Sequence, residues 1–141
     1  MSSRTKARKR ALDILFGADV RGVPIAAMLD EEAGRAATQP QRESSWPYAR
    51  ELVEGVEAHL ADIDAEIEAH AQGWPLERMP ALDRAIARLA AWEILYNDEV
   101  PDAVAIAEAV ESATVLSTED SAGFLNGLLG GITRGKGLDA D

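Results

Sequence analysis

The 141-residue sequence contains no cysteine, which excludes disulfides and thiolate metal ligands. No apolar run reaches the ~18 residues that a membrane-spanning helix needs. Asp13 and Asp19 interrupt the stretch that follows the basic N-terminus, so we expect no signal peptide. We therefore expect a cytoplasmic protein without a membrane partner. No segment alternates between apolar and polar residues with the period of two that is typical of strands. These absences favour an all-helical protein.

The sequence also has few residues suited to catalysis or metal binding. It contains two histidines, His59 and His70, which lie too far apart to share a helical turn. Glu66 lies one turn before His70, but a single acid–histidine pair falls short of a zinc site. The glycine-rich run at 130–137 has Gly137 where a phosphate loop needs Ser or Thr. We therefore expect a protein that is not an enzyme and has no metal and no cofactor.

Apolar residues recur at helical spacing along most of the chain and predict about seven helices. The third predicted helix runs in one piece from Pro47 to about Ile67, and the fifth, from about Leu82 to Tyr96, is apolar on several sides and is expected at the centre of the core. We expect one domain over residues 1–134 and a frayed tail over 135–141. The helices are predicted to begin after Ser2 or Ser3, at Pro24, after Ser45, near Pro75, at about Leu82, at Pro101 and after Ser117 or Thr118.

Positive charge is concentrated at one end of an acidic chain. The formal net charge is −11, yet residues 1–10 hold five cations and no acid, which leaves −16 for the rest. Exposed charges separated by more than ~8 Å are largely screened from each other, so a local basic patch can bind a polyanion. Cations also oppose the dipole at a helix N-terminus, which indicates a role other than helix stability. The five cations are Arg4, Lys6, Arg8, Lys9 and Arg10.

Charge alone leaves two interpretations about even: a phosphate-binding helix end, or an exposed terminus that aids solubility. Leu12 and Phe16 fall beside this basic run and off the buried face of the helix, so we expect a semi-exposed pair where a protein and an RNA meet, unless another helix covers it. Three to five phosphate contacts predict a salt slope of about −2 to −3.5. The seven aromatic residues are scattered and predict no stacking platform, so a protein partner is expected.

Five segments, in order and at suitable spacing, resemble the NusB transcription-antitermination family. The last of them, DSAGFLNGLL, resembles the family's closing Asp-Ser-x-x-Phe-Val-Asn-Gly-x-Leu. Each segment alone is a weak indication of the family, and all five together are a specific one. The segments are Arg4–Phe16, Tyr48–Val56, Asp83–Glu93, Val100–Glu111 and Asp120–Leu129.

The resemblance implies an all-α fold of two three-helix bundles around a central region. It implies binding of single-stranded boxA RNA from ribosomal RNA leader transcripts. It also implies pairing with NusE, the ribosomal small-subunit protein that doubles as an elongation factor. With other Nus factors, the pair would join the RNA polymerase elongation complex and promote readthrough of terminators.

The resemblance and the charge pattern together predict site residues. The expected footprint on RNA is shifted from the family pattern, because Thr5 stands where a further arginine is common and cations follow one turn later. The predicted RNA-binding residues are Arg4, Lys6, Arg8, Lys9, Arg10 and Asp120, and the predicted partner-binding residues are Leu12, Phe16, Asp83 and Phe124.

Two alternatives stay open at this point. The first is a homodimeric interaction scaffold that masks its own basic helix, because Leu12 and Phe16 could self-associate as readily as they bind a partner. The second is the RNA-recognition module of a ribosomal RNA methyltransferase, which carries a similar helical domain. That module needs a long catalytic domain after it, and this chain ends at Asp141.

Overall fold

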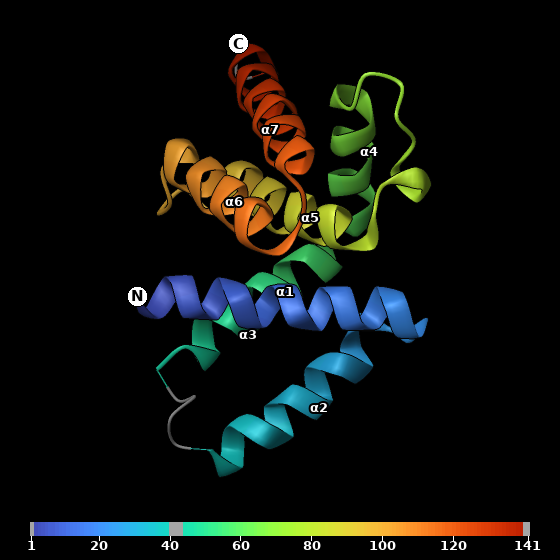
Figure 1. The fold of residues 1–141 in the computed structure, drawn as a ribbon. Coiled ribbons are helices and arrows are strands. Elements are labelled where there is room, and N and C mark those ends of the chain that lie inside the picture. The colour runs from blue at the N-terminus through green and yellow to red at the C-terminus, as the bar shows by residue number, and fades with distance from the viewer. Residues whose placement is uncertain (1, 40–43, 140–141) are drawn as a thin grey trace. The chain divides into compact units, whose positions relative to one another are not determined.

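The structure is a computed structural model that describes residues 2–39 and 44–139. Every regular element in these two stretches is a helix (Figure 1). Seven of them are α-helices, which confirms the predicted all-α class. The chain divides into two compact units. The N-terminal unit, residues 1–58, contains α1 to α3, and the C-terminal unit, residues 59–141, contains α4 to α7. No helix in the described ranges is both long and apolar enough to cross a membrane.

Helix α1 (Ser3–Arg21) begins and ends where its capping residues predict. The Oγ of Ser2 accepts a hydrogen bond from the backbone N–H of Thr5, which satisfies one of the unpaired donors at the helix start. Gly22 follows the last turn with a φ of 66°, a left-handed conformation that glycine adopts without steric cost. The basic run is therefore the first half of a regular, capped helix.

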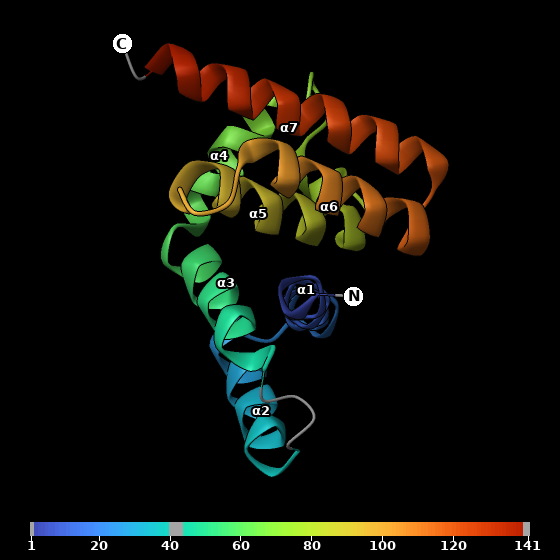
Figure 2. The ribbon, with the colours of Figure 1, turned by 90° about the vertical axis from the view of Figure 1, so that its left-hand side faces the viewer.

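Two further helices complete the N-terminal unit: α2 (Ile25–Thr38) and α3 (Trp46–Ala58), both packed against α1 (Figure 2). A Cβ added at Gly17 of α1 would lie 2.7 Å from the Cε of Met28, so the tip of the Met28 side chain packs against this glycine. The predicted buried stripe of α1 is confirmed. Its members are Ala7, Ala11, Ile14, Leu15 and Ala18.

The prediction of one continuous third helix is wrong. Helix α3 ends at Ala58, and α4 (Leu60–His70) begins after His59, whose φ of −121° and ψ of 23° are not helical. The imidazole of His59 stacks on the ring of Tyr96 at 4.0 Å between centroids. Apolar periodicity indicates which face of a helix is buried, and it does not indicate whether the backbone is continuous. The apolar spacing therefore continues across the break at which the two units divide.

The C-terminal unit places α5 (Ala81–Tyr96) in contact with α4, α6 (Asp102–Leu116) and α7 (Glu119–Asp139). Figure 2 shows α7 lying along α6, and α5 packs against both of these helices. Helix α5 is buried on several sides, which confirms the expectation for its apolar sequence. The helix that was predicted to begin near Pro75 is a single 3-10 turn, η2 (Leu76–Arg78).

The C-terminal end of α7 is longer than the sequence predicted. The expected tail from residue 135 is helical as far as Asp139, and residues 140 and 141 lie outside the described residues. The Nζ of Lys136 donates to the carbonyl of Ile94 at 2.8 Å and pairs with Asp102 at 2.8 Å. These contacts tie the last turns of α7 to α5 and α6, so the helix does not end at residue 134.

Candidate nucleic-acid interface

The five cations of the basic run point to different sides of α1. Successive residues of an α-helix are turned by ~100°, so residues two apart lie almost on opposite sides. Arg4 and Arg8 approach α3, Arg10 approaches α2, and Lys6 and Lys9 are exposed. The run is therefore a set of distinct environments and not one uniform patch.

Arg4 and Arg8 share an aromatic neighbour that the sequence did not predict. The guanidinium of Arg4 lies 4.5 Å from the centroid of the Tyr48 ring, and that of Arg8 lies 5.8 Å from it. Such cation–π contacts contribute about 0.5–1 kcal/mol at exposed sites. The sequence suggested no stacking platform, because Tyr48 lies forty residues from the run. Packing of α1 against α3 brings the ring to the two arginines.

Lys9 is held only weakly. Its Nζ lies 2.7 Å from the Oδ1 of Asp13, but the two side chains are 51% and 62% exposed. An exposed pair of this kind at i,i+4 is worth about 0.3–0.5 kcal/mol and is screened by salt. A phosphate group can therefore replace Asp13 as the partner of Lys9 at little cost.

Arg10 does not fit the prediction of an RNA contact. Its Nη2 lies 2.9 Å from the Oε1 of Glu32, its Nη1 donates to the Oγ of Ser45 at 3.0 Å, and its guanidinium lies 5.1 Å from the Trp46 ring centroid. The side chains of Arg10 and Glu32 are 12% and 10% exposed. The fold thus places this cation between α1, α2 and α3, largely out of contact with water.

The expected semi-exposed pair of Leu12 and Phe16 is also corrected. Leu12 is buried, at 2% exposure, while Phe16 is 36% exposed. The buried stripe of α1 contains three alanines, which allow neighbouring elements to approach closely enough to cover a residue at its edge. Phe16 therefore remains as an exposed apolar residue on this helix, and Leu12 belongs to the core.

Asp83 is another predicted partner contact that the structure buries. It is 1% exposed, and its two carboxylate oxygens accept hydrogen bonds from the Oγ of Ser117 at 2.8 Å and from the Oγ of Ser121 at 2.7 Å. Asp83 thus connects the first turn of α5 to the junction of α6 and α7. A side chain in this position acts on a partner surface through the elements that it holds.

Asp120 and Phe124 lie on the exposed side of that junction. Asp120 is exposed in the first turn of α7, and Phe124 lies one turn later. The half-buried ring of Phe124 packs edge-to-face on Trp74 at 4.8 Å between centroids. The two rings line a groove of about 470 Å³ between the end of α4 and α7, whose other walls include His70, Gln72, Gly127 and Arg134.

The described residues contain no group of three or more histidines or acids placed to hold a metal ion. The Nε2 of His70 lies 3.6 Å from the Oε2 of Glu66. Burial raises the pKa of Tyr96 above its ordinary value, and the nearby carboxylates of Asp62 and Glu66 raise it further.

The two units differ strongly in charge. Residues 1–58 hold nine cations and nine acids, whereas residues 59–141 hold five cations and sixteen acids. The whole net charge of −11 therefore belongs to the C-terminal unit, and the N-terminal unit is neutral with its cations concentrated in α1.

Comparison with protein families and curated proteins agrees with the segments found in the sequence. The model of the NusB family matches residues 5–134. The chain is 62% identical over 141 residues to the transcription antitermination protein NusB of Leifsonia xyli subsp. xyli (strain CTCB07). That alignment covers 100% of this chain and 98% of the relative.

Comparison with solved structures gives the same fold. A structure of T. maritima NusB matches with a TM-score of 0.82 and 29% identity, covering 93% of this chain and 90% of that one. A chain from a structure of the antitermination factors NusB and NusE in complex with dsRNA matches with a TM-score of 0.82 and 24% identity. It covers 96% of this chain and 98% of that one.

Proposed function

The chain belongs to the NusB family, and on that basis we propose that it is a transcription antitermination factor. We propose that it binds boxA-type RNA of ribosomal RNA leader transcripts together with NusE, as a member of the RNA polymerase elongation complex with other Nus factors. This places its action on nascent transcripts in the cytoplasm. Its role is to bind and to recruit, and it catalyses no reaction.

The observation that carries this proposal is the arrangement of cations on α1. Arg4 and Arg8 lie against the ring of Tyr48, and Lys6 and Lys9 are exposed on the same helix. A guanidinium can bind a phosphate through two parallel hydrogen bonds, and an aromatic face can stack on any base. Three or four phosphate contacts to a single strand predict a salt slope of about −2 to −3.

The C-terminal unit supports a different ligand. Its net charge of −11 repels a polyanion and suits a partner with a cationic surface. We propose that Phe124 contacts NusE and that Phe16, in the N-terminal unit, is a separate partner contact. We also propose that Asp120 accepts hydrogen bonds from base amino groups of the RNA, which carry no negative charge. A NusB of the same fold has been solved with NusE and double-stranded RNA, which supports this pairing of ligands.

A binding titration tests the proposal. A labelled boxA-like oligonucleotide is titrated with the chain, with and without NusE, at 50 and 200 mM salt. We expect weak binding by the chain alone, a salt slope of about −2 to −3, and tighter binding in the presence of NusE. An RNA that stays unbound at the lower salt concentration, even with NusE present, contradicts the proposal.

A homodimeric scaffold is the second candidate, and the exposed side chains of Phe16 and Val20 favour it. The burial of Leu12 removes half of the apolar pair that first suggested it. Sedimentation across a range of protein concentrations, with and without the oligonucleotide, separates the two. A dimer that persists and excludes RNA supports the scaffold, whereas a monomer or a dimer that RNA dissociates supports the antitermination factor.

A further inference from the structure

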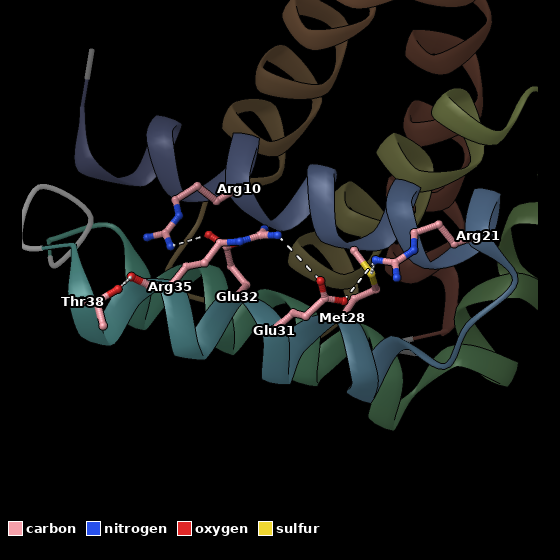
Figure 3. Close-up of polar contacts among 7 residues, drawn as sticks. All are labelled: Arg10, Arg21, Met28, Glu31, Glu32, Arg35 and Thr38. Carbon is pink, nitrogen blue, oxygen red and sulfur yellow. Dashed lines mark hydrogen bonds and ion pairs between the residues drawn. The ribbon is translucent and has the colours of Figure 1, made fainter.

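Two acids of α2 face arginines of α1 (Figure 3). The Oε2 of Glu31 lies 3.0 Å from the Nη1 of Arg21. The two oxygens of Glu32 receive different cations: Oε1 lies 2.9 Å from the Nη2 of Arg10, and Oε2 lies 3.0 Å from the Nη1 of Arg35. Glu32 is thus enclosed by two guanidinium groups, one from each helix.

The pair of Arg10 and Glu32 differs from the other ion pairs of α1 in its burial. The side chains of Arg21 and Glu31 are 53% and 45% exposed, whereas those of Arg10 and Glu32 are 12% and 10% exposed. Charges withdrawn from water are screened much less by salt than exposed ones. A phosphate at the surface therefore competes poorly with Glu32 for Arg10.

The groups around Arg10 strengthen this preference. Ser45, which is buried, accepts a hydrogen bond from Nη1, and the ring of Trp46 lies beneath the guanidinium. To contact a phosphate, Arg10 would give up these contacts and leave the carboxylate of Glu32 in the interior with one cation fewer. Removing one partner of a buried pair is costly, because the remaining charge stays desolvated.

We propose that Glu32 withholds Arg10 from RNA, and this inference rests on the proposed function of the chain. Arg10 is then a structural residue that joins α1 to α2 and α3. The RNA is gripped by the cations on the other sides of α1, which include Arg4, Lys6 and Arg8. Glu32 thereby limits the number of phosphates that the basic run can contact.

Matched arginine substitutions on one helix test the inference. Arg10→Met and Arg8→Met each remove one charge and keep much of the apolar stem, and both variants are titrated with the boxA-like oligonucleotide at several salt concentrations. We expect Arg8→Met to bind more weakly, with a slope less steep by about 0.7. We expect Arg10→Met to bind within about twofold of the unaltered chain, with the same slope.

Glu32→Gln tests the same inference in the opposite direction. Without the carboxylate, Arg10 is released toward solvent, so we expect tighter RNA binding and a slope steeper by up to about 0.7. This gain disappears in the double variant Arg10→Met/Glu32→Gln. Circular dichroism establishes that each variant is folded, and if Glu32→Gln does not fold, the comparison of Arg10→Met with Arg8→Met decides.

The possible outcomes separate the inference from the proposed function. Equal losses of affinity and slope in Arg8→Met and Arg10→Met overturn the inference and leave RNA binding intact. A Glu32→Gln variant that folds and binds RNA no better than the unaltered chain also overturns it. Absence of RNA binding by the unaltered chain, with and without NusE, overturns the proposed function and this inference with it.

Discussion

The two units use their charged residues in opposite ways. In the N-terminal unit, positive and negative charges are equal in number, and four of the five cations of the basic run in α1 remain at or near the surface. In the C-terminal unit acids outnumber cations about threefold, yet one of its two predicted site acids, Asp83, is buried and hydrogen-bonded within the fold. The candidate nucleic-acid surface takes its cations from one helix, α1, whereas the second surface depends on how several helices meet.

The largest expected effect is a loss of stability on substitution of Asp83, and it tests whether this side chain is buried or contacts a partner at the surface. In Asp83→Lys, an ammonium group replaces a buried carboxylate that accepts two serine hydroxyls, so we expect a loss of about 3–5 kcal/mol in the free energy of unfolding. Urea denaturation measures the loss. Asp83→Asn keeps the shape and one acceptor and should lose less, about 1–2 kcal/mol.

The opposite result would restore Asp83 as a surface residue. If Asp83→Lys unfolds at the same urea concentration as the unaltered chain but no longer pairs with NusE, the side chain contacts the partner directly. The difference between the two units would then be smaller than the structure indicates.

The next effect concerns RNA binding by the N-terminal unit. Replacing Arg4, Lys6 and Arg8 by Ala removes three cations from α1, so we expect RNA affinity to fall about 10- to 100-fold at physiological salt. The salt slope should become less steep by about 2. Fluorescence anisotropy of a labelled boxA-like RNA measures both quantities.

Arg21→Ala is the control for that variant. Arg21 is an exposed arginine at the far end of α1, where it pairs with Glu31. It should leave RNA binding within about twofold. If Arg21→Ala lowers affinity as much as the triple variant does, net charge and not the position of the cations determines binding.

The fold class was predictable because its signals are local. Capping by Ser2, termination at Gly22 and the apolar spacing of each helix all depend on residues within a few turns of each other. The break at His59 was missed for the opposite reason, since the ring that stacks on it, Tyr96, lies 37 residues away. The frayed tail was expected from glycines, but Lys136 ties it to α5 and α6.

The candidate site was predictable only where its residues are close together in the sequence. The charges of the basic run are visible in the sequence, but their partners come from other helices: Tyr48 from α3 and Glu32 from α2. Composition therefore gave five candidate cations, while packing decides which of them can reach a phosphate. Burial of Leu12 and Asp83 likewise depends on helices distant in sequence.

A smaller effect tests the groove of the C-terminal unit. Phe124→Ala removes a ring that packs on Trp74, so we expect pairing with NusE to weaken about tenfold, within the range of a partner-facing aromatic residue. The salt slope of RNA binding by the chain alone should not change. Calorimetric titration with NusE measures the affinity, and Phe124→Leu, which keeps apolar volume, should retain most of it. Unchanged pairing in Phe124→Ala would assign the partner contact to other residues.

The smallest effect concerns the ring that joins Arg4 and Arg8. Tyr48→Leu removes the cation–π contacts that position the two guanidinium groups, so we expect RNA affinity to fall about two- to fivefold. Tyr48→Phe keeps the ring and should bind as the unaltered chain does. The charge is the same in all three proteins, so their salt slopes should agree, and only the affinity should separate them. If Tyr48→Phe loses as much as Tyr48→Leu, the hydroxyl and not the ring face carries the effect, and the arginines of α1 act on RNA without an aromatic platform.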